Sequence, residues 1–106
     1  MHDFAQISGS IESNINAKSL ENLLRLRGVE SFVDSNDLFI GGASNLRIEF
    51  DKGINTFRSD GGQHDMVLKQ AKDLADLFSQ SGINFFIEVC GDDWEQIIAF
   101  GDYGRN

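Results

Sequence analysis

Several kinds of residue and segment are scarce in this chain, and each scarcity excludes a class of protein. The 106 residues contain no proline and a single cysteine, Cys90. One cysteine excludes an internal disulfide, and it excludes a zinc site built on paired cysteines, because structural zinc takes four ligands. No apolar run approaches the ~20 residues that cross a bilayer, so we expect no membrane association.

Basic residues are also scarce. Nine Lys and Arg stand against seventeen Asp and Glu, which gives a formal net charge of −8 with both histidines neutral. A protein that binds a phosphate backbone needs the opposite balance, so we expect no direct binding of nucleic acid. The first residues show neither the basic nor the apolar region of a secretory signal. Together with the single cysteine, this favours a cytoplasmic protein.

Motifs for catalysis and for metal binding are absent or incomplete. There is no Gly-x-Gly-x-x-Gly and no phosphate-binding loop, and residues 42–46 resemble a nucleophile elbow but lack its closing glycine. Residues 34–37 begin like a calcium loop, but Leu38 takes a ligand position and no glycine follows. Asp92 and Asp93 are adjacent, and adjacent strand residues point to opposite faces. We therefore predict no catalytic residue, no metal ion and no cofactor.

Apolar residues are plentiful enough for one folded domain over residues 1–106. They make up 41% of the chain, which is too high for a disordered protein. A chain of this length buries about two-thirds of its extended surface when it folds, so a hydrophobic core can form without disulfides or metal. The length leaves no room for a second domain.

Two segments have the periodicity of amphipathic helices. The first follows Asn14 or Asn16, either of which can accept a hydrogen bond from the first turn, and it ends at Gly28, which permits a left-handed stop. The second is predicted over about Gln63–Ser81. Its apolar stripe consists of Val67, Ala71, Leu74, Ala75 and Phe78.

The remaining segments alternate apolar and polar residues, as half-buried strands do. Strands are predicted over Phe4–Ile11, in short runs between Ser31 and Arg58, over Ile83–Val89 and over Trp94–Phe100. Within the second group the connections are too short for parallel crossovers, and Asp51–Gly53 is predicted to be a tight hairpin turn. These strands are therefore expected to form an antiparallel meander.

The predicted element order is β-α-β-β-β-α-β-β, which indicates the α+β class. Two amphipathic helices each need an apolar surface to cover, and one antiparallel sheet of about five to six strands supplies it. We expect a two-layer sandwich with both helices on the same face of the sheet. A ferredoxin-like core with an additional hairpin is one arrangement of this kind.

Acidic residues are concentrated near the end of the sequence. Residues 83–106 have a net charge of −4, so half of the net charge lies in less than a quarter of the chain. The same segment holds the only tryptophan and the only tyrosine. Trp and Tyr often anchor interfaces, and charge steers association. The predicted partner-binding residues are Asp92, Asp93, Trp94, Glu95, Asp102 and Tyr103.

Small size, acidity and missing catalytic residues together favour a neutralising protein that binds and inhibits a basic protein. Immunity proteins and antitoxins against nuclease toxins have this profile, and so do phage-encoded inhibitors of nucleic-acid-guided defence complexes, the anti-CRISPR proteins. In both cases the expected partner is a toxin nuclease or a nucleic-acid-binding complex. The carboxylates would pair with the Lys and Arg residues that this partner otherwise uses to bind phosphate.

Two alternatives remain open. Apolar side chains lie on both faces of the strands that contain Phe39, Phe85, Phe86 and Ile97–Ile98. This favours pairing with a second copy in a homo-oligomeric structural or regulatory module, of which a homodimer is one form. The acidic turns would then serve solubility alone. A small enzyme or ligand-binding domain is the other alternative, with Cys90, His64 and the acidic turn as its only reactive groups. A half-buried strand cysteine is the simpler interpretation of Cys90.

Overall fold

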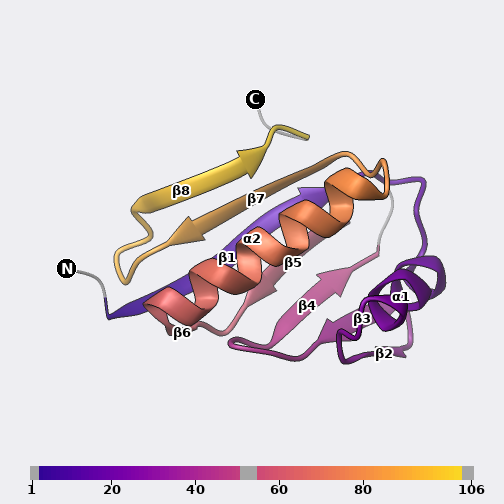
Figure 1. Ribbon diagram of the computed structural model, residues 1–106, viewed down its shortest axis with the longest axis horizontal. Coiled ribbons are helices and arrows are strands. Elements are labelled where there is room, and N and C mark those ends of the chain that lie inside the picture. The colour runs from indigo at the N-terminus through magenta and orange to yellow at the C-terminus, as the bar shows by residue number, and fades with distance from the viewer. Residues whose placement is uncertain (1–2, 51–54, 104–106) are drawn as a thin grey trace.

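A computed structural model gives the chain a two-layer structure, and it describes residues 3–50 and 55–103. One layer is an antiparallel sheet, and the other consists of two α-helices on a single face of that sheet (Figure 1). The helices are α1 (Ala17–Leu26) and α2 (His64–Gln80). The strands are β1 (Phe4–Ile11), β2 (Ser31–Asp34), β3 (Asp37–Ile40), β4 (Leu46–Glu49), β5 (Asn55–Ser59), β6 (Gly62–Gln63), β7 (Phe85–Cys90) and β8 (Gln96–Gly101).

The sheet has the strand order β2-β3-β4-β5-β1-β7-β8, and β6 pairs with the start of β1. Both β5 and β7 are antiparallel to β1, which lies between them, so they are parallel to each other. They are joined through α2. This is the split β-α-β unit of ferredoxin-like folds, here extended by the β2–β3 hairpin on one side and by β8 on the other.

The predicted class, the antiparallel sheet and the placement of both helices on one face are confirmed. The sheet is wider than the five to six strands expected. The region between Ser31 and Ser59 forms four short strands, and Gly62–Gln63 adds a pairing of two residues that is too short to show any periodicity. The predicted hairpin turn at Asp51–Gly53 lies outside the described residues.

Helix α1 begins and ends where the capping residues predicted. The Asn16 side chain accepts a hydrogen bond of 2.8 Å from the Ser19 N–H, and the helix stops before Gly28, which has a φ of 73°. The buried side of α1 packs against β2 and β3. It includes one charged group, Glu21, which is 2% exposed and accepts hydrogen bonds from Lys18 Nζ and Arg25 Nη2 at 3.1 and 3.2 Å.

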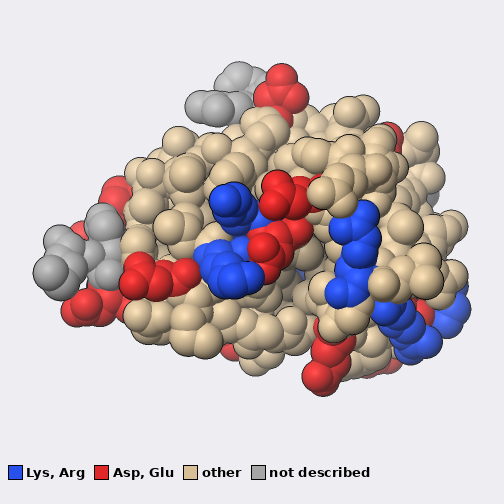
Figure 2. Space-filling view, in the orientation of Figure 1, with Lys and Arg blue, Asp and Glu red and all other residues tan. Residues whose placement is uncertain are grey.

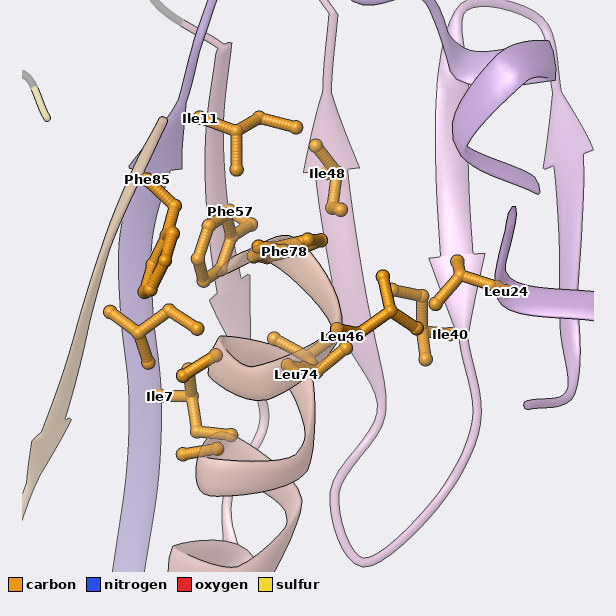
Figure 3. Close-up of a cluster of buried hydrophobic side chains, with 14 of the residues drawn as sticks. Ile7, Ile11, Leu24, Ile40, Leu46, Ile48, Phe57, Leu74, Phe78 and Phe85 are labelled. Atoms are coloured by element: carbon orange, nitrogen blue, oxygen red, sulfur yellow. The ribbon is translucent and has the colours of Figure 1, made fainter. Parts of the chain in front are cut away.

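Helix α2 is the main cover of the sheet and packs against β1 and β7. Its predicted apolar stripe is buried, and Leu77 joins it. The Gln63 side chain caps the helix by accepting a hydrogen bond from the Met66 N–H, and Gly82 follows its last turn with a φ of 70°. The core lies between α2 and the strands, with the rings of Phe78 and Phe85 5.6 Å apart. Figure 3 shows this core, formed by Ile7, Ile11, Leu24, Ile40, Leu46, Ile48, Phe57, Leu74, Phe78 and Phe85.

One glycine in the central strand is required by a close approach. A Cβ atom at Gly9 would lie 2.5 Å from Cζ of Phe57 and would also overlap the backbone carbonyl oxygen of Phe86. Phe57 in β5 is the direct cross-strand partner of Gly9. Because Gly9 has no side chain, the Phe57 ring can lie directly over the backbone of β1.

Candidate protein-binding surface

Four of the six predicted partner-binding residues lie together in the turn between β7 and β8. Asp92, Asp93, Trp94 and Glu95 are all exposed. The turn is closed by two backbone hydrogen bonds of 3.0 Å, one from the Gly91 N–H to the Glu95 carbonyl and one from the Trp94 N–H to the Gly91 carbonyl. The Glu95 carboxylate also accepts a hydrogen bond of 3.0 Å from the Asp93 N–H. Three carboxylates are thus held next to one tryptophan on a compact turn.

Trp94 contacts Arg58, which is not among the predicted partner-binding residues. The Trp94 backbone is left-handed, with a φ of 62°, and the residue is 50% exposed. The guanidinium carbon of Arg58 lies 5.3 Å from the centre of the indole ring, which is a cation–π contact. Arg58 comes from β5, on the other side of the central strand. The turn is therefore positioned over the sheet face opposite the helices.

This face, called the open face below, carries polar and aromatic residues in a row across the strands. Register places Phe32, Phe39, Arg47, Arg58, Ser8, Glu88 and Ala99 next to one another in successive strands. The rings of Phe32 and Phe39 stack with their centres 5.0 Å apart, and Arg47 lies over Phe39 at 5.7 Å. Arg47 also forms an ion pair of 2.6 Å with Asp37, the residue opposite the end of β2.

The other two predicted residues lie at the far end of β8. Asp102 and Tyr103 both donate their N–H to the Phe85 carbonyl, at 3.0 and 3.1 Å. The Tyr103 carbonyl accepts a hydrogen bond of 2.7 Å from the Ser10 hydroxyl, and its phenol oxygen accepts one of 3.3 Å from the Ser13 N–H. A strand of this length separates them from the turn by about 20 Å. Asp102 is exposed there, whereas Tyr103 ties the end of β8 to the central strand.

Charge is divided unevenly between the two layers. We define the acidic hairpin as residues 83–103, that is β7, the turn and β8 with their flanks. It carries five carboxylates and no Lys or Arg. The helical layer, taken as α1, its C-cap Arg27 and α2, carries five bases and four acids. In Figure 2, which shows the helix-bearing side, basic side chains gather over α1 and both signs alternate over α2. Net negative charge thus belongs to the sheet layer.

Cys90 and His64 belong to the reactive groups of the enzyme alternative, and Cys90 is the last residue of β7. Cys90 is 1% exposed, and burial together with the nearby carboxylates of Glu88 and Glu95 raises the pKa of its thiol to about 11. A thiol kept protonated at neutral pH is a poor nucleophile. His64 begins α2, and its Nδ1 atom lies 2.9 Å from the Asp65 carboxylate.

A groove of about 760 Å³ lies on the helix-bearing side, between α2 and the loops that follow α1 and β3. Three of its polar side chains have partners within the protein. The Gln70 side chain accepts hydrogen bonds from the Ser44 N–H and hydroxyl and donates one to the Ser44 carbonyl, and Lys69 pairs with Asp73 at 2.8 Å. In the described residues, no cluster of three or more His, Cys, Asp or Glu could hold a metal ion. Neither described helix combines the length and the apolar character needed to cross a bilayer.

The fold and the surface together define an α+β protein with an acidic hairpin at one side of its sheet. Comparisons of the chain with protein-family models, with curated proteins and with solved structures gave no match. The functional proposal is therefore built on the chemistry of the surface itself.

Proposed function

We propose that this protein binds a basic partner protein through the acidic hairpin and the adjoining open face, and that binding inhibits the partner. The observation that supports the proposal is the division of charge. The acidic hairpin contains five carboxylates and no Lys or Arg of its own, whereas the helical layer is balanced. A surface of one sign attracts a partner of the other sign and sets its orientation.

Trp94 would contribute the binding affinity that the carboxylates alone do not provide. An exposed ion pair contributes only about 0.2–1 kcal/mol to the free energy of binding. The three carboxylates of the turn would therefore raise the association rate and the selectivity for a basic partner more than the affinity. Tryptophan is among the residues that most often dominate binding energy. Trp94 is half exposed, and its contact with Arg58 restrains the ring before any partner arrives. A ring that is already ordered loses less entropy on binding.

The expected partner is a nuclease or a nucleic-acid-guided complex, because such proteins expose Lys and Arg to bind phosphate. Asp92, Asp93 and Glu95 would occupy those bases and keep nucleic acid away. The protein would then act as an immunity protein or antitoxin, or as a phage-encoded inhibitor of a defence complex. A cytoplasmic location fits either role.

The test compares two variants of equal charge. D92N/D93N/E95Q neutralises the turn, and D65N/D73N/D76N neutralises three exposed carboxylates of α2. Both change the formal net charge from −8 to −5. Each variant and the wild type are immobilised and incubated with a lysate of the source organism, and the captured proteins are eluted with rising salt and identified by mass spectrometry.

We expect the wild type and the α2 variant to capture the same basic nucleic-acid-binding protein, and the turn variant to lose it. The purified partner should also lose its nucleic-acid binding or cleavage when wild-type protein is added, and keep it when the turn variant is added. Equal capture by the two variants would contradict the proposal, because only net charge would then matter.

A homo-oligomeric structural or regulatory module without catalytic activity is the second candidate. It is favoured by Phe32, which is 56% exposed and stacks on Phe39 at the side of the open face away from the acidic hairpin. Light scattering of the wild type and of Phe32→Ser at micromolar concentration tests it. A wild-type dimer that the substitution dissociates supports a module of this kind, and a wild-type monomer refutes it.

A further inference from the structure

Strand β8 has an edge with no partner among the described residues. It is the outermost strand in Figure 1, and it pairs only with β7. Hydrogen bonds alternate along an antiparallel strand, so every second residue directs its N–H and C=O away from its neighbour. The Asp102 N–H donates to Phe85 of β7. By this alternation, the backbone N–H and C=O groups of Phe100 and Ile98 also point toward β7. The backbone N–H and C=O groups of Ala99, between them, point away from the sheet.

From Ile98 to Gly101, this edge has few of the features that usually keep sheet edges from pairing. Natural edge strands are commonly short, charged, bulged or interrupted by proline. Gln96–Gly101 is six residues long and contains neither a charge nor a proline. Its one irregularity is a bulge near its start, where Ile97 is an extra residue opposite Val89 and Cys90 of β7, and the pairing from Ile98 to Gly101 is regular. The opposite edge, β2, has four residues and ends in Asp34. Ile98 of β8 is also 37% exposed, so apolar surface accompanies the free backbone groups.

Charge at the two ends of β8 decides what kind of segment fits. Asp92, Asp93 and Glu95 precede the strand, and Asp102 follows it, all exposed. A second copy paired antiparallel through β8 would bring the turn of one molecule beside Asp102 of the other, and like charges would face each other at both ends. A segment with Lys or Arg at both ends would meet carboxylates at both ends instead.

We propose that the basic partner contributes an extended segment, which pairs with the free edge of β8 and adds a strand to the sheet. The inference rests on the proposed function and specifies how the partner is held. Backbone hydrogen bonds along Gln96–Gly101 provide the contact, and flanking bases pair with the turn and with Asp102. The segment has about six residues between its basic ends, because it must span about 20 Å.

The test uses a synthetic peptide, Lys-Lys-Val-Thr-Val-Thr-Val-Thr-Lys-Lys, titrated into the full-length ¹⁵N-labelled protein. We expect amide shifts along β8 and slower hydrogen exchange at the Ala99 N–H. Ala99→Pro removes that outward donor without removing a bond to β7, and it should weaken peptide binding about tenfold. The same peptide with Glu in place of Lys should not bind. Shifts confined to Asp92–Glu95 would overturn strand addition.

The control is Ser31→Pro at the opposite edge. The Gly41 N–H donates to the Glu30 carbonyl. By the same alternation, the backbone N–H and C=O groups of Phe32 point toward β3, and the N–H of Ser31 points away from the sheet. Ser31→Pro should bind the peptide like the wild type, and circular dichroism of both proline variants should show the wild-type fold. Equal weakening in both variants would mean a general loss of structure and would also overturn the proposal.

The captured partner then separates this inference from the function on which it rests. If Ala99→Pro loses the partner and Ser31→Pro keeps it, strand addition is supported. If Ala99→Pro binds normally while D92N/D93N/E95Q does not, strand addition is wrong and the proposed function stands. If neither variant loses the partner, both are wrong.

Discussion

Gly9→Ala is expected to destabilise the protein strongly, although it adds a single methyl group. The new Cβ atom would lie 2.5 Å from the Phe57 ring, whereas ordinary contacts begin at about 3.4 Å. Phe57 is 5% exposed, and the other obstacle is the Phe86 carbonyl of a paired strand. Overpacking of this kind costs about 1–3 kcal/mol, and a clash with backbone places it near the upper value.

That loss is large for a domain of this size. Total stability is typically about 5–15 kcal/mol, and 1 kcal/mol shifts the melting temperature of a domain of ~100 residues by about 4–8 °C. A cost of about 3 kcal/mol therefore lowers the melting temperature by about 10–25 °C. Urea unfolding followed by tryptophan fluorescence gives the free energy directly, and a thermal scan gives the midpoint.

Gly28→Ala is the matched control. Gly28 has a φ of 73° and no atom within 4 Å of its ideal Cβ position, so alanine there adds only left-handed strain of about 1–2 kcal/mol. Combining Gly9→Ala with Phe57→Leu removes part of the obstacle, and the cost of Gly9→Ala should fall in that background. The steric argument fails if Gly9→Ala costs no more than Gly28→Ala, or if its cost is the same with Leu at position 57.

Three further expectations follow from single contacts. Burial raises the pKa of the Cys90 thiol from 9.0 to about 11, so Ellman's reagent at pH 8 should label it only as the protein unfolds. The raised pKa adds stability below pH 9 that disappears as the pH rises toward 11, and Cys90→Ala should lack this loss in urea midpoints. Asn55→Ala should lower the free energy of unfolding by about 1–3 kcal/mol, because Asn55, 1% exposed, donates to the Glu12 carbonyl at 3.0 Å. Arg58→Ala should shift Trp94 emission to the red as the ring gains water, and an unchanged spectrum would refute the stacking contact.

The helices were predictable because their signals are local. The Asn16 cap and the glycine after α1 bound one helix, and the stripe from Val67 to Phe78 defines the other within one or two residues. Alternation along the strands also showed that the helices had one sheet face to cover. Strand β6 carries no such signal, because two residues have no period, and its pairing with Phe4 and Ala5 depends on where the chain returns.

The site was only partly predictable, because neighbours in sequence are not always neighbours in space. Asp92 and Asp102 stand ten positions apart, and a strand that runs between them places them at opposite ends of a hairpin. Arg58 was missed for the opposite reason. Because Phe57 faces the core, the alternation along the strand places Arg58 on the open face. Only the strand order β5-β1-β7 brings Arg58 close to Trp94. Whether these residues bind a partner stays a prediction.

The central position of β1 has a consequence during synthesis. β1 leaves the ribosome before either of its neighbours, and Ile7 must wait for Val89 before its strand is paired on both sides. The meander from β2 to β5 can form meanwhile from residues close in sequence. Domains dominated by such distant pairings fold in milliseconds to seconds, and unpaired apolar strands aggregate in that interval. The apolar residues of β1 are interrupted by Ser8, Gly9 and Ser10. This interruption lowers the tendency of the unpaired strand to aggregate before β5 and β7 are available.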